Sequence, residues 1–480
     1  MNNFGEKVLT GTLWRVGERI GASLVTFIVS VVLARLLDPS EYGVIGLVLI
    51  ITSVLEVLVD SGFCKALIQK KEVTNEDYST VFTFNVISSC VLYVLLFLAA
   101  PLVELFFRID GLTTLVRVSG ILVVIFGFKS VVQAYIMRNM KFRMFFWATL
   151  VGTILSGVIA LAMAYAGMGV WALVAQQLIN PFVDTILLWI TVKWQPGFRF
   201  SSSSFRKLFS FGWKLLVIDI VDKVFVNLRT LFVGKFYSTA DLGFYDTGRK
   251  LPNSIYTNLD SAIRSVVFPA FSSEQNDRDA VKQHMLKTIN ICTFLTTPVL
   301  FGLAACSENL IILLYTEKWR AAVPFMQIAC MIWALNSIQA LNQQVILSVG
   351  RSDITLKQEM IIKCLSVISI VIAVQYSVMA IALSHLVVTL LGLLINLVPN
   401  RKLIHCSLWE QFRAFAPGFL LSAAMAVCVF FIGKLEMNRF LQLAVQVGSG
   451  MVVYLLTAAL LKMDGFVYLR EMVKQKLKRK

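Results

Sequence analysis

The sequence predicts an all-α integral membrane protein with about 14 transmembrane helices. Of its 480 residues, 58% are hydrophobic and 15% are charged, and the mean hydropathy is +0.77. A soluble domain has too little interior to bury so large an apolar fraction. A membrane-spanning helix needs about 20 mostly apolar residues. Fourteen segments meet this requirement, at residues 8–37, 44–65, 78–103, 112–138, 144–166, 169–192, 208–234, 244–270, 284–306, 321–349, 354–376, 378–399, 413–434 and 439–462.

The distribution of basic residues predicts the orientation. If the N-terminus is cytoplasmic, the loops and tail on that side carry 25 Lys and Arg residues and the opposite loops carry six. Cytoplasmic loops of membrane proteins are enriched in Lys and Arg, so both termini are expected inside the cell. The net charge of +16 is then a consequence of topology, and nucleic acid is not an expected partner. The segment 308–316 is too short to span and is expected at the outer interface.

An internal repeat predicts two lobes. Residues 34–44 align with residues 234–244, sharing a basic residue, a short turn, an acid, an apolar residue and a glycine. Gly43 and Gly243 suit a tight helix start after that turn. Six spans separate the copies, which makes them parallel repeats facing a central cavity. We expect six-helix lobes at 1–197 and 198–408, divided near a polar linker, and two further helices with a basic amphipathic tail at 409–480.

Thirteen Lys and Arg residues lie within the predicted spans, against nine acids. A cation at a helix centre costs about 2.5–3.5 kcal/mol on insertion scales, so such residues usually face a wet cavity or an anion. They concentrate in the first two helices of each predicted lobe. The guanidinium fork of arginine donates two hydrogen bonds to phosphate, so an anionic, pyrophosphate-bearing ligand is expected. The candidate cavity cations are Arg15, Arg19, Arg229, Arg249, Lys250 and Arg264.

Acids and amides complete the candidate cavity. Four acids could line it or couple transport to a cation, either Na⁺ or H⁺: Glu56, Asp60, Asp219 and Asp222. Candidate wall residues are Lys129, Gln133, Asn336, Gln339 and Gln343. For individual charges the alternatives are interfacial snorkelling, as for Arg15, or structural pairing, as for Glu18 with Arg15. The three histidines are isolated and the eight cysteines are single, so we expect no catalytic centre, metal site, disulfide framework or cofactor.

Several short motifs resemble those of a known family. They are VLARLLDPSEYG at 32–43, DSGF at 60–63, ALIQKK at 66–71, FGW at 211–213, VFPAF at 267–271 and EKW at 317–319. In order and spacing, over about residues 8–400, they resemble polysaccharide-export flippases. This branch includes colanic-acid exporters and O-antigen flippases of the multidrug/oligosaccharidyl-lipid/polysaccharide transporter superfamily.

The resemblance implies a flippase that serves surface polysaccharide biosynthesis. Such a protein moves an undecaprenyl-pyrophosphate-linked oligosaccharide from the cytoplasmic to the periplasmic leaflet of the bacterial inner membrane by alternating access. It also implies that arginines of a V-shaped cavity hold the pyrophosphate. Expected partners are the lipid-linked oligosaccharide and membrane lipids, with other polysaccharide-assembly proteins as candidates, and the expected state is a monomer.

Three other functions remain as alternatives. A cation-coupled multidrug exporter of the same superfamily would favour acids in its cavity, whereas cations lead here. A membrane glycan polymerase or ligase would need a large outer loop carrying catalytic groups, and the outer loops are short. An ATP-driven transporter would need a phosphate loop, but residues 120–130 place six residues between the glycines where four are required.

Overall fold

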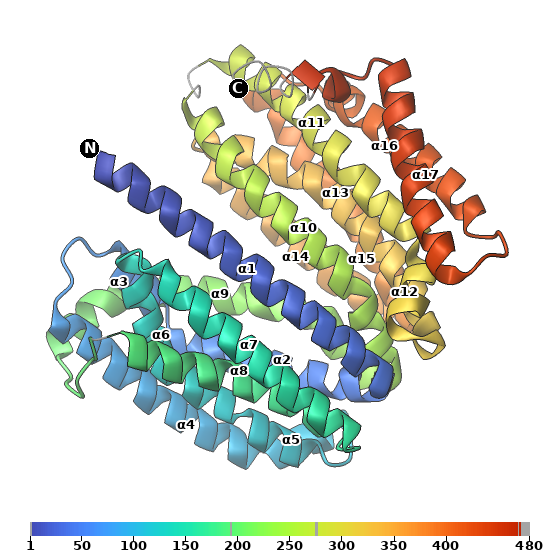
Figure 1. The fold of residues 1–480 in the computed structure, drawn as a ribbon. Helices are drawn as coiled ribbons and strands as arrows, with labels where there is room; N and C mark the ends of the chain where they lie inside the picture. Colours follow the sequence, from blue (N-terminus) through green and yellow to red (C-terminus); the bar gives the residue numbers. More distant parts are fainter. Residues whose placement is uncertain (1, 193, 274–276, 469, 472–480) are drawn as a thin grey trace. The chain divides into compact units, whose positions relative to one another are not determined.

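A computed structural model describes the backbone of residues 2–192, 194–273, 277–468 and 470–471. Within these residues the side chains of 2–13, 15, 16, 19, 262, 264–266, 268–270 and 273 lie outside the description. Every regular element of the described chain is a helix (Figure 1), which confirms the predicted all-α class. The chain forms two compact units, residues 1–243 and 244–480.

The first unit consists of nine helices and the start of a tenth. The helix α7 contacts both α8 and α1, and α4 contacts α6 and α5 (Figure 1). Leu33, Val48 and Leu173 belong to the apolar core that joins α1, α2 and α8. The helices are α1 Asn2–Leu36, α2 Pro39–Asp60, α3 Phe63–Gln69, α4 Asn75–Phe107, α5 Leu112–Ser119, α6 Ile121–Arg138, α7 Phe142–Tyr165, α8 Val170–Thr191 and α9 Ser202–Phe236.

The second unit holds most of α10 and the helices that follow it. The helix α11 packs on α13 and α16, and α15 packs on α13 and α14. The helices are α10 Thr239–Ser273, α11 Arg278–Ala305, α12 Ser307–Tyr315, the 3-10 helix η1 Glu317–Ala322, α13 Val323–Ser348, α14 Ser352–Ala373, α15 Val378–Leu403, α16 Leu408–Ile432 and α17 Arg439–Leu460. The segment expected to be too short to span corresponds to α12, which has nine residues.

Ten helices of the described chain are long and apolar enough to cross a membrane, which confirms a multi-pass membrane protein. They account for ten of the fourteen predicted spans. The other four predicted spans correspond to α1, α9, α10 and α14, which are long helices that carry many charged residues. In α1 only Ile20–Leu36 forms a shorter apolar stretch. The full count of fourteen spans therefore stays a prediction. The four spans that are not among the ten are those in which charged residues interrupt the apolar sequence.

The repeat is visible in the helix boundaries. The helices α1 and α9 each have 35 residues and end at Leu36 and Phe236, an offset of 200. Capping contacts between the same two positions of the repeat start the next helices, with the donor and acceptor positions exchanged. The Asp38 backbone N–H donates to the Glu41 carboxylate (2.8 Å), and the Asp241 N–H donates to the Ser238 hydroxyl (3.1 Å). Such contacts satisfy backbone groups that a helix start leaves unpaired. The predicted lobe boundary near residue 198 itself stays a prediction.

The two repeat glycines permit a close backbone contact within the first unit. A Cβ atom on Gly43 would lie 1.8 Å from the carbonyl oxygen of Thr239, and one on Gly243 would lie 1.9 Å from that of Pro39. The contact is reciprocal across the 200-residue offset, as expected of elements related by a two-fold axis. Each glycine is the fifth residue of its helix and has no positive φ. The glycines therefore serve close packing, and not the tight helix start that the sequence suggested.

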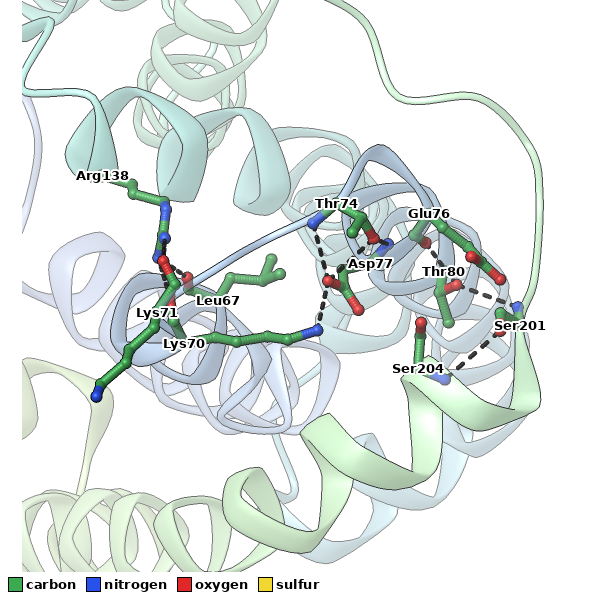
Figure 2. Close-up of polar contacts among 10 residues, drawn as sticks. All are labelled: Leu67, Lys70, Lys71, Thr74, Glu76, Asp77, Thr80, Arg138, Ser201 and Ser204. Carbon is green, nitrogen blue, oxygen red and sulfur yellow. Dashed lines mark hydrogen bonds and ion pairs between the residues drawn. The ribbon is translucent and has the colours of Figure 1, made fainter.

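A network of polar contacts fixes one end of the first unit (Figure 2). The Arg138 guanidinium donates to four backbone carbonyls at the end of α3, those of Leu67, Ile68, Lys70 and Lys71, at 2.5–3.1 Å. Beside it, Lys70 Nζ lies 2.5 Å from Asp77 Oδ2. The linker before α9 is held on α4 because the Ser201 N–H donates to the Thr80 hydroxyl at 3.1 Å. The polar linker is thus anchored to the first unit.

Candidate functional site

A polar cavity of about 480 Å³ lies inside the first unit. Five helices contribute to its wall: α1, α2, α6, α7 and α8. Apolar lining is a minority, and most of the wall is charged, hydroxyl or amide. The lining residues are Glu18, Leu49, Thr52, Ser53, Glu56, Leu122, Lys129, Gln133, Phe145, Thr149, Gln177, Asn180, Pro181 and Asp184. A polar chamber of this size within a membrane protein holds water, ions or a small polar ligand.

A buried ion pair forms one side of the cavity. Lys129 Nζ on α6 lies 2.5 Å from Asp184 Oδ2 on α8, and the two side chains are 19% and 5% exposed. Each charge is stabilised by the other, because an isolated ion at this depth would be strongly disfavoured. The second carboxylate oxygen, Asp184 Oδ1, is buried and has no hydrogen-bond partner among the described residues. That oxygen can accept a hydrogen bond or a cation entering the cavity.

Among the described residues, the cavity lining holds three carboxyl groups, those of Glu18, Glu56 and Asp184, and one ammonium, that of Lys129. Glu18 is buried, and Glu56 is within electrostatic range of Lys129 and of Lys223 on α9. An excess of acids favours a proton or a metal cation over a phosphate. The described carboxyl groups of this cavity can therefore take up a proton or a cation.

Several cavity residues were not among the predicted site residues. They are Glu18, Thr52, Ser53, Thr149, Gln177, Asn180 and Asp184, with Glu18 interpreted only as a structural partner of Arg15. The sequence does contain a signal for three of these seven residues. Gln177, Asn180 and Asp184 lie three and four residues apart in α8, which places them on one helix face. Such a polar stripe in an otherwise apolar helix indicates an internal polar site.

A second group of charges joins α2, α3 and α9. Lys65 Nζ on α3 lies 2.5 Å from Asp219 Oδ2 on α9, and both side chains are partly exposed. Asp60, at the end of α2, accepts a hydrogen bond from the Cys64 backbone N–H at 3.2 Å. Asp222 lies on the exposed side of α9. Of the four predicted acids, Glu56 lines the cavity while Asp60 and Asp219 belong to this neighbouring group.

The predicted cations lie in both units. Arg229 on α9 is 7% exposed. In the second unit, the Arg249 guanidinium lies 4.8 Å from the centroid of the Tyr245 ring, and Lys250 is exposed. The side chains of Arg15, Arg19 and Arg264 lie outside the described residues. The predicted convergence of these cations on one cavity therefore stays a prediction.

The predicted wall residues separate into two groups. Lys129 and Gln133 line the cavity of the first unit. Two of the three amides of α13, those of Gln339 and Gln343, make interhelical contacts in the second unit. Gln339 Nε2 donates to the Thr389 carbonyl on α15 at 3.0 Å. Gln343 Nε2 donates to Glu359 on α14 at 2.8 Å, and Asn336 accepts from Gln339 at 3.2 Å. Gln339 and Gln343 thus join α13 to its neighbours, and Asn336 contacts Gln339 within α13.

Comparisons with known proteins identify the family. A family model described as polysaccharide biosynthesis protein matches residues 32–324. The chain belongs to this family. It is 24% identical over 463 residues to the teichuronic acid biosynthesis protein TuaB of Bacillus subtilis (strain 168), which covers 95% of this chain and 96% of that protein. It is 23% identical over 433 residues to the lipopolysaccharide biosynthesis protein WzxC of Escherichia coli (strain K12), covering 88% of each.

A solved structure shares the fold. The lipid II flippase MurJ, in an inward closed conformation, matches with a TM-score of 0.76 and 14% identity, over 96% of this chain and 100% of that one. The family and the fold together confirm the resemblance to polysaccharide-export flippases. The protein is thus a multi-pass membrane protein of a polysaccharide biosynthesis family, with a fold shared with a lipid flippase.

Proposed function

We propose that the protein moves an undecaprenyl-pyrophosphate-linked oligosaccharide from the cytoplasmic to the periplasmic leaflet of the bacterial inner membrane. The observation that carries the proposal is a fold shared with a lipid II flippase over 96% of the chain, in a member of a polysaccharide biosynthesis family. Two parallel repeats can rock against each other and expose a site to each leaflet in turn. Both termini are then cytoplasmic, in keeping with the basic loops.

The proposed ligands of the pyrophosphate are Arg15, Arg19, Arg229, Arg249, Lys250 and Arg264. Two physical arguments support this assignment. A buried guanidinium such as that of Arg229 is retained in a membrane helix only when anions offset its desolvation. The Arg249 guanidinium lies over the Tyr245 ring, and its planar fork can donate paired hydrogen bonds to phosphate oxygens.

For energy coupling we propose that the acidic cavity of the first unit carries a proton. A metal cation would have to compete with the Lys129 ammonium, which already lies 2.5 Å from Asp184. Glu56, near that pair, can accept a proton and lose its attraction for Lys129 and Lys223. Because α2, α6, α8 and α9 all contribute charges, protonation changes the interactions that hold these helices together.

Flipping by purified protein in vesicles tests the substrate site. We expect Arg249→Ala to slow flipping of a fluorescent lipid-linked oligosaccharide by about tenfold or more, because each charge-assisted hydrogen bond to phosphate contributes strongly to binding. Arg117→Ala is the matched control. Arg117 is also an intramembrane arginine, but its guanidinium lies 4.2 Å from the Phe97 ring and donates to the Phe97 carbonyl. Equal rates for wild type and both variants would contradict the assignment of Arg249.

A pH gradient across the vesicles tests the coupling site separately. We expect Glu56→Gln to remove the response of the flipping rate to the gradient. The control is Glu104→Gln, because Glu104 accepts hydrogen bonds from the backbone of Gly111 and Thr113 at a helix end, away from the cavity. A Glu56→Gln variant that still responds to the gradient like the wild type would exclude Glu56 as the proton carrier.

A further inference from the structure

A second polar pocket lies in the other unit, at the end where α11 and α16 begin. Its volume is about 490 Å³. It is formed by α11, by α16 and by the segment that follows α17. Its polar lining includes Lys287, Asn290, Arg413, Asp464 and Tyr468. No part of the proposed flipping mechanism uses these groups.

Two cations of the pocket wall lie over aromatic rings, one ring in the wall and one beside it. Lys287 Nζ lies 4.5 Å from the centroid of the Tyr468 ring, and the Arg413 guanidinium lies 5.2 Å from that of Trp409. Trp409 is 59% exposed and stacks on Phe412. Exposed tryptophan beside Lys and Arg is typical of the headgroup region of a membrane, where an amphipathic ring meets both water and lipid.

One of the two acids in the pocket is already neutralised. Glu410 Oε1 lies 2.7 Å from Lys282 Nζ, and its other oxygen accepts the Ser407 backbone N–H at the start of α16. Among the described residues that line the pocket, Asp464 is then the remaining acid beside Lys287 and Arg413. Counted with Lys282, three described cations meet two acids here, which favours an anion.

An apolar stripe continues from the cationic end. Residues 287, 291, 295 and 299 lie four apart and share one face of α11. Beyond Lys287 and Ile291, the side chains of Leu295 and Val299 are 44% and 46% exposed. A charged end followed by an exposed apolar strip has the dimensions and polarity of a phospholipid, with its phosphate at Lys287 and an acyl chain along the stripe.

We propose that this pocket binds the phosphate headgroup of one anionic phospholipid, with an acyl chain on the Ile291–Val299 face of α11. Lys287 and Arg413 bind the phosphate, and Tyr468 and Trp409 pack against the glycerol region. The chain's own C-terminus is an unsuitable occupant because residues 472–480 carry five basic residues and no acid. Under the predicted orientation the pocket faces the cytoplasmic leaflet.

Native mass spectrometry of the full-length protein tests the proposal. The probes are phosphatidylglycerol, phosphatidylcholine and glycerol 3-phosphate added to protein in detergent. We expect phosphatidylglycerol to bind more tightly than phosphatidylcholine, and glycerol 3-phosphate not to compete because it lacks acyl chains. A surface cation contributes roughly fivefold to binding of anionic lipid, so Lys287→Ala with Arg413→Ala is expected to weaken phosphatidylglycerol binding about thirtyfold.

Two further variants keep the test decisive. Lys434→Ala is the matched control, since Lys434 lies 5.0 Å from the Phe430 ring at the opposite end of α16, and it should leave the preference unchanged. Asp464→Asn removes the remaining acid and should tighten phosphatidylglycerol binding, which tests the site even if the double variant does not fold. The proposal is wrong if Lys434→Ala matches the double variant, if Asp464→Asn weakens binding, or if glycerol 3-phosphate displaces the lipid.

Discussion

Loss of the Lys129 ammonium is expected to destabilise the first unit strongly. Lys129→Met keeps most of the side-chain length but leaves Asp184 without its partner, and that side chain is only 5% exposed. Breaking a buried pair by removing one member costs about 3–5 kcal/mol, because an uncompensated charge remains.

The double variant isolates the charge effect. Lys129→Met with Asp184→Asn removes both charges, and the free energy of unfolding is expected to return to within about 1–2 kcal/mol of wild type. The assay is SDS-induced unfolding of purified protein in mixed micelles, followed by intrinsic tryptophan fluorescence. Lys282→Met is the control, because the Lys282–Glu410 pair is more exposed and is expected to contribute about 1 kcal/mol or less. A single variant as stable as the double variant, or as Lys282→Met, would refute the reasoning.

Three further outcomes follow from the structure. Gly43→Ala is expected to reduce the free energy of unfolding by about 3 kcal/mol or more, because its Cβ would overlap the Thr239 carbonyl, and Gly448→Ala, with open space at its Cβ, is the control. Arg138→Ala is expected to cost about 2–3 kcal/mol, measured in the same assay, because it removes the charged donor that four carbonyls share; full stability would contradict the role given to the network in Figure 2. Burial raises the pKa of the Cys406 thiol to about 11, so this thiol is expected to resist maleimide at pH 8 while a cysteine placed at exposed His405 reacts; rapid labelling of Cys406 would show that the site is open.

The sequence predicted the repeat and most of the helices for clear physical reasons. Membrane spans need long apolar segments, and a helix corner needs caps, so both leave local signals. The motif at residues 34–44 and its copy at 234–244 predicted equivalent corners, and the helices α1 and α9 end 200 residues apart as expected. The spans that composition alone does not establish are those in which charges interrupt the apolar pattern.

The cavity of the first unit was only partly predictable. Helical spacing shows which residues share a face, and the four-residue spacing of Glu56 and Asp60 places both on one face of α2. It does not show which faces of different helices meet. The pairing of Lys129 on α6 with Asp184 on α8 depends on how these helices pack, and the repeat directed attention to the first two helices of each lobe instead. The polar stripe from Gln177 to Asp184 can be read from the sequence. Only the structure shows that this stripe, α2 and α6 line the same cavity.

The central claim is that intramembrane cations carry a lipid by its pyrophosphate. The most direct measurement compares flipping of two lipids by the purified wild-type protein in vesicles. Both lipids carry the same polyprenyl chain and the same fluorescent oligosaccharide, but one is joined through pyrophosphate and the other through an uncharged linkage. We expect flipping of the pyrophosphate lipid at least about tenfold faster, as loss of the charge-assisted hydrogen bonds implies. Equal rates for the two lipids would contradict the claim.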